Sequence, residues 1–186
     1  KKVVPPYVRI IRLIRDIPGE SIVAGNLITN LRQVMKDRGV KCRCIRCREA
    51  RDKKFKIKNL KLKVIKYKAS GGEEYFLSYE SRDGKILYGF CRLRLVSRNS
   101  QLITHNLIKN AALIRELHVY GELVSVGGNK KIQHAGLGKR LMVEAEKIAR
   151  QNGYEKMVVI AGVGVRGYYR KLGYKLQNSY MVKSLV

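Results

Sequence analysis

Apolar and polar residues alternate in several parts of this chain, and a repeat of two predicts strands. The strand-like segments are residues 7–15, 60–68, 75–79, 86–96, 156–160 and 174–182, with a strand pair at 111–126 that is broken near Gly121. Apolar residues three or four positions apart instead predict helices at 26–39, 136–151 and 168–172. Antiparallel strands followed by helix, strand, helix and strand favour a mixed α/β (α+β) sheet flanked by helices.

Turn-forming residues mark the ends of several segments. Asn26 is the expected N-cap of the first helix, and Gly39 stands where a C-terminal glycine is expected. Gly153 ends the second helix. The pair Asp83-Gly84 is a hairpin signal between two strand-like runs. We therefore expect the strands on either side of this turn to pair.

The charge of the chain is strongly unbalanced. Among 186 residues, 40 Lys and Arg stand against 14 Asp and Glu, a formal net charge of +26. Such a field attracts polyanions, above all nucleic acid or an anionic membrane surface. The length suits one domain, or a domain with a small extension, and excludes a multidomain enzyme.

The apolar and aromatic content is enough for a folded core, so disorder is a weak explanation of the composition. No apolar run is long enough to cross a membrane, and residues 1–6 do not resemble a secretion signal. We expect a cytoplasmic protein without a membrane partner. The missing initiator Met suggests a chain cut from a longer protein.

The positive charge is concentrated towards the N-terminus. Residues 1–70 hold 21 Lys and Arg against 5 Asp and Glu, net +16, whereas residues 71–186 carry net +10. We predict a basic extension over 1–70 and a second domain over 71–186.

Lysines recur nearly every second residue in 61–68, so a strand there would present a largely cationic face opposite an apolar one. One interpretation is a solvated face that prevents edge pairing. Continuity with other basic residues favours a nucleic-acid-binding surface, and the scarcity of aromatics favours backbone contact with structured RNA. The predicted RNA-binding residues are Arg9, Arg12, Arg43, Arg46, Lys53, Lys54, Lys61, Lys63 and Lys66.

The chain has four cysteines, three of them spaced as C-x-C-x-x-C: Cys42, Cys44, Cys47 and Cys91. Disulfides are rare inside cells, and thiolates at this spacing can reach one tetrahedral Zn(II), which Cys91 would complete as the fourth ligand. Such a metal would be structural and would pin the basic extension to the following domain. Redox-sensitive thiols and an iron-sulfur ligand set are the alternatives. His105 and His134 are reserve ligands, although single histidines more often lie at a surface or in a pocket.

A glycine-rich loop, residues 133–139, lies between a strand and the helix that starts near Leu137. Glycines let the backbone approach a ligand, and the N–H groups and dipole of a helix start favour a phosphate or pyrophosphate. By itself, the pattern G-x-G is equally typical of a turn that introduces a helix.

Two further stretches give the loop its context. Residues 133–138 read QHAGLG, residues 115–121 read RELHVYG, and residues 162–174 read GVGVRGYYRKLGY. The loop resembles the acetyl-CoA pyrophosphate loop of the GNAT superfamily of N-acetyltransferases. The set, with YMVK at 180–183, resembles the family of the catalytic subunit of Elongator, which couples a radical-SAM domain to an acetyltransferase-like domain and acts on wobble uridines of tRNA.

The resemblance implies a GNAT fold over 71–186 and an acetyl-CoA site. The implied cofactor contacts are Glu116, Leu117, His118, Val119, Gln133, His134, Gly136, Leu137, Gly138, Lys139 and Tyr169. Backbone N–H groups of a splayed strand can stabilise a developing oxyanion. Glu116 or His118 is the candidate base, and Tyr168 or Tyr169 the candidate acid towards the thiolate. One of the two tyrosines is expected only to pack in the core, and the sequence does not say which.

The resemblance also implies an incomplete enzyme. No upstream cysteine motif for an iron-sulfur centre precedes these segments, so the cluster and S-adenosylmethionine would belong to a missing radical-SAM domain. The expected function is acetyl-CoA use or hydrolysis when tRNA is bound, with the radical-SAM domain and Elongator-like subunits as further partners.

Two other functions compete with this prediction. A lysine acetyltransferase for basic proteins is disfavoured because a chain of +26 repels a Lys-rich tail. A zinc-stapled RNA-binding module with a catalytically silent acetyltransferase fold is the second alternative.

Overall fold

The computed structural model describes residues 1, 3–14, 18–25, 27–28, 30–50, 60–96, 110–120 and 136–186. These residues form two compact units, Lys1–Glu49 and Ala50–Val186. The sequence-based boundary at residue 70 differs from this division because residue 70 lies in the turn of a hairpin. Among the described residues, no helix is long and apolar enough to span a membrane.

The first unit has little regular structure: η1 (Gly19–Ser21), α1 (Leu31–Asp37) and α2 (Ile45–Arg48). Helix α1 ends as predicted, with Gly39 at φ +71° just beyond the C-cap, but it begins at Leu31 and not after residue 26. Residues 27 and 28 are not helical, and Leu27 is 61% exposed.

The strand predicted at 7–15 is wrong for the residues that are described, 7–14, which form an irregular extended segment. Its backbone carbonyl groups accept hydrogen bonds from groups that do not belong to a strand. The carbonyl of Val8 accepts from the backbone N–H of Ile45, and that of Ile11 accepts from the guanidinium groups of Arg32 and Arg46. The alternating apolar residues of this segment therefore belong to an extended backbone that is not part of a sheet.

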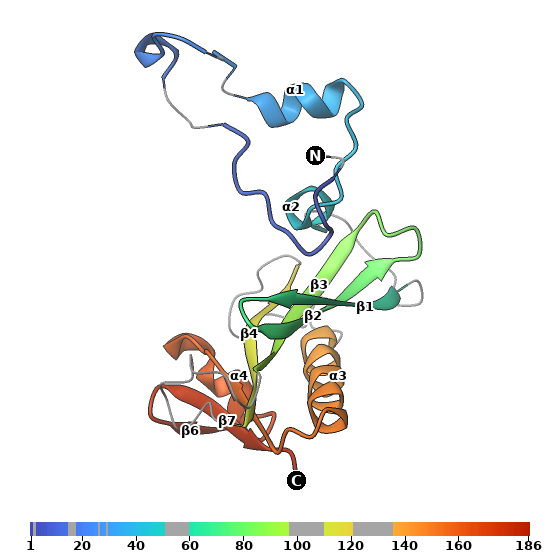
Figure 1. Cartoon of the computed structure of the whole chain (residues 1–186), viewed down its shortest axis with the longest axis vertical. Coiled ribbons are helices and arrows are strands. Elements are labelled where there is room, and N and C mark those ends of the chain that lie inside the picture. The colour runs from blue at the N-terminus through green and yellow to red at the C-terminus, as the bar shows by residue number, and fades with distance from the viewer. Residues whose placement is uncertain are drawn as a thin grey trace, which may run out of the picture. The chain divides into compact units, whose positions relative to one another are not determined.

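The second unit is built on a seven-stranded sheet in the order β1-β2-β3-β4-β5-β7-β6 (Figure 1). The strands are β1 (Leu60–Ala69), β2 (Gly72–Ser81), β3 (Leu87–Val96), β4 (Ala111–Val119), β5 (Lys156–Val159), β6 (Lys175–Gln177) and β7 (Tyr180–Ser184). All neighbours are antiparallel except β4 and β5. The predicted mixed, mostly antiparallel sheet is therefore confirmed.

Two tight turns shape the first three strands. Ser70 and Gly71 both have positive φ, a geometry that suits a two-residue hairpin, and they join β1 to β2. The predicted turn at Asp83-Gly84 joins β2 to β3. The strand prediction is correct for all three elements.

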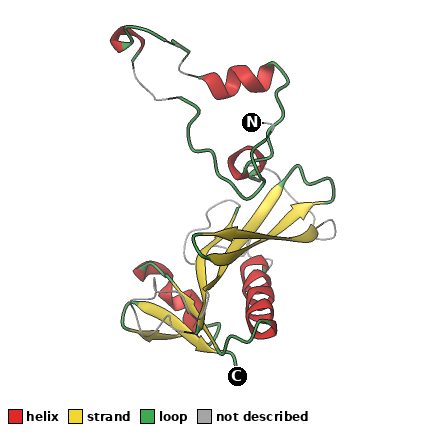
Figure 2. Ribbon diagram, viewed as in Figure 1, coloured by secondary structure: helices red, strands yellow, loops and turns green. Residues whose placement is uncertain are grey.

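Helices α3 (Leu137–Gln151) and α4 (Arg166–Arg170) accompany the sheet, with η4 (Val163–Val165) before α4 (Figure 2). Helix α3 packs on β2, β3 and β4 and buries an apolar stripe that includes Leu141, Met142 and Ala145. The core beneath it is made of fully buried strand residues, among them Leu77, Leu93 and Met157. This packing fixes the start of α3 near β4.

The single strand predicted at 174–182 is instead the hairpin of β6 and β7. Asn178 adopts φ +53°, a left-handed conformation that asparagine tolerates, and it reverses the chain. The C-terminal strand β7 then pairs with β5.

Candidate active site and cysteine cluster

A β-bulge changes the course of β4. Arg92 on β3 lies opposite Glu116, whereas the next residue, Leu93, lies opposite Ile114, so Arg115 is an extra residue in β4. The pairing of β4 with β5 covers residues 111–114. A bulge bends its strand and ends regular pairing. Among the described residues, 116–119 pair only with β3, and their other side forms an open edge of β4.

Strand alternation places the side chains of residues 116–119 on two faces of the sheet. Val119 faces α3, where its Cγ2 atom lies 3.7 Å from the point at which a Cβ atom on Gly138 would stand. Glu116 lies on the opposite face, where its carboxylate accepts a hydrogen bond of 2.9 Å from Nε of Arg92. His118 shares that face and stacks on Phe90 at a centroid distance of 5.9 Å. The two candidate bases are exposed, on the same face.

The start of α3 has the geometry of an anion site. Gly136 is its N-cap in the left-handed conformation, φ +71°, and no side chain caps the helix. The first-turn N–H groups of a helix have no intrahelical acceptor, and the dipole there favours negative charge. Leu137 is buried and anchors the turn, whereas Lys139 is exposed. These residues therefore fit the pyrophosphate of acetyl-CoA.

Two predicted contacts of this loop, Gln133 and His134, lie outside the described residues. Their role stays a prediction.

The two adjacent tyrosines of α4 differ in their surroundings. Tyr168 is 38% exposed, and its hydroxyl oxygen lies 2.7 Å from the position of a Cβ atom on Gly138. Tyr169 is 6% exposed and packs edge-on against Tyr168 and Tyr174, at centroid distances of 5.2 and 5.9 Å. Burial raises the pKa of Tyr168, and raises that of Tyr169 to about 12. Tyr168 is thus the protonated hydroxyl beside the helix start, and Tyr169 is the core residue.

A buried charge that the sequence reasoning missed anchors this region. Glu146 on α3 is 4% exposed and accepts hydrogen bonds from the Tyr174 hydroxyl, at 2.8 Å, and from Nζ of Lys183, at 2.8 and 3.0 Å. The signal was an acidic residue among the apolar positions of a helix. The carboxylate ties α3 to β7 and to the tyrosine cluster. Arg92, the partner of Glu116, was also missed, because a strand period does not identify cross-strand pairs.

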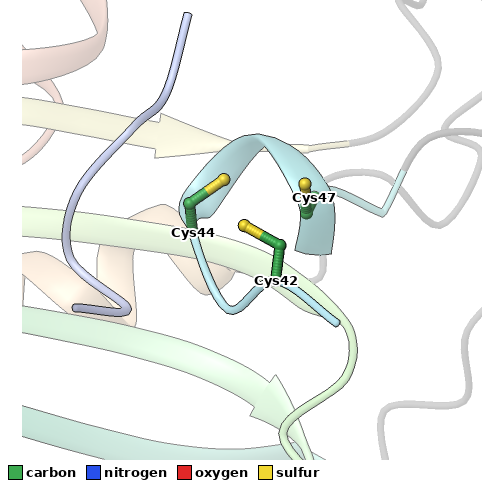
Figure 3. A group of neighbouring side chains, drawn as sticks. All are labelled: Cys42, Cys44 and Cys47. Carbon is green, nitrogen blue, oxygen red and sulfur yellow. The ribbon is translucent and has the colours of Figure 1, made fainter. Parts of the chain in front are cut away.

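In the first unit, the sulfur atoms of Cys42, Cys44 and Cys47 lie within 4.8 Å of one another around the start of α2 (Figure 3). Zn–S bonds of about 2.3 Å put two sulfurs of one tetrahedral site roughly 4 Å apart. The three thiols therefore fit a single Zn(II) ion. The fourth predicted ligand, Cys91, belongs to the second unit, where it is fully buried in β3 and burial raises its thiol pKa. Its participation stays a prediction.

The thiols of this cluster differ in acidity. Burial raises the pKa of Cys44, but backbone N–H groups of Ile10 and Cys47 and the neighbouring thiols outweigh it and lower the value to about 7. Burial and the adjacent sulfur atoms raise the pKa of Cys47 to about 11. Arg32 donates a hydrogen bond of 3.3 Å to Sγ of Cys47. Of these two thiols, Cys44 is therefore the more acidic one.

The sequence matches the acetyltransferase (GNAT) family over residues 45–174. The chain belongs to this family. As a GNAT chain it carries an acetyltransferase domain, and the family implies acetyl-CoA use. The matched residues include the bulge, the start of α3 and both tyrosines, so the predicted fold class is confirmed.

Individual relatives extend over the whole chain. It is 44% identical to the tRNA uridine(34) acetyltransferase of Dehalococcoides mccartyi over 100% of its length and 42% of that protein. It is 44% identical to Elongator complex protein 3 of Bos taurus over 98% of its length and 35% of that protein. The structure of archaeal Elp3 from Methanocaldococcus infernus, with an N-terminal deletion, superposes with a TM-score of 0.77 at 38% identity, covering 99% of this chain and 46% of that one. These matches confirm the resemblance to the Elongator family, and the chain spans less than half of each relative.

Of the predicted RNA-binding residues, three lie on β1, and the others lie in the first unit or outside the described residues. Strand alternation puts Lys61 and Lys63 on one face of β1 and Lys66 on the other, where Lys66 forms a 2.8 Å ion pair with Glu73. The expectation of one cationic face on this strand was therefore wrong, because the spacing from Lys63 to Lys66 is odd.

The remaining basic residues belong to the first unit or are not described. Arg9 forms a 2.6 Å ion pair with Glu49, and Arg46 donates to the carbonyl of Ile11. Arg43 and Arg12 are exposed. Two further predicted residues, Lys53 and Lys54, lie outside the described residues. RNA contact by any of these residues stays a prediction.

Proposed function

We propose that this chain is the acetyl-CoA-binding, tRNA-binding part of a tRNA wobble-uridine modification enzyme. The observation that carries the proposal is the meeting of Tyr168 with Gly138 beside the open edge of β4. This arrangement occurs in a chain that is 44% identical over its whole length to a relative named tRNA uridine(34) acetyltransferase.

Acetyl-CoA supplies an activated acetyl group as a thioester when it is bound. The first turn of α3 would hold its pyrophosphate, and the backbone N–H groups of residues 116–119 that point away from β3 would face the acetyl carbonyl. The Tyr168 hydroxyl donates a proton to the departing thiolate, and Glu116 or His118 takes the proton from the attacking water or acceptor.

The arrangement of these groups limits where the reaction takes place. Glu116 and His118 lie on the face of β4 opposite α3, whereas Tyr168 lies on the α3 side. A base and an acid on opposite sides of one strand can both reach a carbonyl only at the strand's open edge. The base could then assist addition to the carbonyl while Tyr168 protonates the thiolate that leaves when the tetrahedral intermediate collapses.

The partner is proposed to be tRNA because the net charge of +26 suits a polyanion and the relatives' names specify a tRNA uridine. Zn(II) at Cys42, Cys44 and Cys47 would stiffen the basic unit. By resemblance, a radical-SAM domain with its iron-sulfur cluster would use the acetyl group, with Elongator-like subunits as further partners.

Thioester hydrolysis with and without tRNA tests the proposal. We expect turnover that depends on tRNA, and loss of acetyl-CoA binding in calorimetry when Gly136→Asp and Gly138→Asp put carboxylates at the start of α3. Gly164→Asp is the matched control, because a Cβ atom at Gly164 meets nothing within 4 Å. Tight tRNA binding without turnover would instead favour a silent RNA-binding module. Acetyl transfer to histone tails without tRNA would favour a lysine acetyltransferase.

A further inference from the structure

A buried carboxylate on β2 contacts the residue that forms the bulge of β4. Glu74 is 1% exposed, and its Oε1 atom accepts hydrogen bonds from Arg115 at 2.6 Å and from Arg94 at 3.1 Å. Arg115 is the extra residue of β4, and its side chain is 49% exposed. The extra residue of the bulge is therefore bound, across β3, to a charge inside the sheet.

Two consecutive residues of β4 reach the same face of the sheet. Glu74 pairs with Arg94, so these two side chains share a face, and Arg92 lies on that face two positions before Arg94. Arg115 contacts Glu74, and Glu116 contacts Arg92 at 2.9 Å. Neighbouring residues of a regular strand point to opposite faces, whereas a bulge re-aims a side chain. The two ion pairs therefore go together with the bulge.

The opposite charges of residues 115 and 116 distinguish this position of the bulge from others. If Leu117 were the extra residue, Arg115 would stand opposite Arg92, and like charges that face each other across strands are unfavourable. Glu116 would then stand opposite Cys91, which is fully buried. In the observed register, both charges of β4 instead contact a charge of opposite sign.

We propose that the Glu74–Arg115 ion pair keeps the bulge at residue 115, so that both residues are positioning residues for Glu116. A shift of the bulge to Leu117 would turn the side chain of Glu116 to the other face of the sheet and its backbone N–H group to the other edge of the strand. Both the candidate base and the open edge of β4 would change. The catalytic consequence rests on the proposed function, whereas the register of β4 does not.

The first experiment compares the register of the parent chain with that of Arg115→Glu. This variant reverses the charge beside Glu74 and gains a partner in Arg92 if the bulge moves to Leu117. NMR of the whole chain follows the nuclear Overhauser contacts between β3 and β4. The parent should show backbone contacts between residues 92 and 116, and the variant should show contacts between residues 92 and 115. A variant that keeps the parent's contacts overturns the proposal.

Arg115→Met serves where Arg115→Glu does not fold, because it removes the ion pair without adding a repulsion. It should show both sets of contacts, since the charge of Glu116 still favours the original register. The parent's contacts alone in Arg115→Met would also overturn the proposal.

The second experiment measures tRNA-dependent thioester hydrolysis at a temperature where every variant is folded. Arg115→Met and Glu74→Gln should each lower kcat about tenfold and leave KM for acetyl-CoA unchanged, because the start of α3 keeps its geometry. Arg115→Lys keeps the charge and should restore most of kcat. Lys85→Met is the matched control, because it removes an exposed ion pair with Asp83 in the turn between β2 and β3.

The outcomes separate this proposal from the proposed function. A parent chain without tRNA-dependent turnover rejects the proposed function, and the NMR comparison still tests the register. A lower unfolding temperature of Arg115→Met with the parent's kcat shows that the ion pair supports the fold alone, and rejects the positioning role.

Discussion

The hydroxyl oxygen of Tyr168 lies 2.7 Å from the point where a Cβ atom on Gly138 would stand. A real Cβ atom does not approach oxygen so closely, so a larger residue at position 138 would push the tyrosine ring aside. The start of α3 and helix α4 thus constrain each other through one glycine and one hydroxyl group.

Gly138→Ala should therefore act through Tyr168. We expect a tRNA-dependent thioester hydrolysis rate reduced about tenfold, because a displaced hydroxyl no longer reaches the leaving thiolate. Tyr168→Phe should give a similar loss, and the double variant should be no slower than either single one, since both act on the same group. Gly164→Ala is the control, because no atom lies within 4 Å of its Cβ position. Fully additive losses would contradict this coupling.

The neighbouring tyrosine should affect folding and not chemistry. Tyr169 is 6% exposed, so Tyr169→Ala is expected to cost about 3–5 kcal/mol of unfolding free energy, as large aromatic truncations do. Tyr168→Ala should cost about 1 kcal/mol, because its side chain is 38% exposed. Denaturant unfolding of both variants measures the difference, and equal costs would show that the two roles were assigned wrongly.

Two adjacent carboxylates of β2, those of Glu73 and Glu74, should also differ clearly in their contribution to the free energy of unfolding. Glu74 is 1% exposed and accepts hydrogen bonds from Arg94, at 3.1 Å, and Arg115, at 2.6 Å. Removing one partner of a buried charge network costs about 3–5 kcal/mol, which we expect for Glu74→Ala. Glu73 pairs with Lys66 at the surface, so Glu73→Ala should cost less than about 1 kcal/mol. A small effect for Glu74→Ala would mean that the pairing is not essential to the sheet.

Two thiols of the cysteine cluster, Cys44 and Cys47, should titrate at widely separated pH values when the cluster is free of metal. A rise in pH should form the Cys44 thiolate near pH 7, whereas Cys47 should ionise only near pH 11. Thiolate absorbance in the ultraviolet measures both steps, with Cys44→Ser removing the first. Zn(II) binding at pH 8 should release protons from the thiols that are still protonated, and acidification below pH 7 should weaken it. A single step near pH 9 would contradict the hydrogen bonding described for Cys44.

The sequence predicted most of the sheet because its strands combine partial alternation with apolar and aromatic runs, as in β2, where residues 74–80 are buried on both faces. β1, β2 and β3 were found for this reason, and the hairpin at Asp83-Gly84 followed from local turn chemistry. The irregular segment at 7–14 has the same alternation but pairs with no described strand. The side chains of Arg32 and Arg46 donate hydrogen bonds to its backbone carbonyl groups instead. An apolar period of two does not reveal which groups form hydrogen bonds with the backbone of a segment.

The part of the candidate site that lies at a helix start could be predicted from a short sequence motif. Contacts between residues far apart in the sequence could not. The glycines at 136 and 138 predicted the start of α3, and phosphate binding there stays a proposal. The pairings of Arg92 with Glu116 and of Glu146 with Lys183 join residues 24 and 37 positions apart, so only the folded register shows them.

The bulge at Arg115 exists because β4 has one residue more than the part of β3 that it pairs with. With one residue fewer, Ile114 and Glu116 would follow one another in a regular ladder opposite Leu93 and Arg92, and nothing in that ladder would bend β4 away from β5. The loss of one position would therefore remove the bend in β4, whereas a substitution that keeps the number of residues would leave a bulge in the strand.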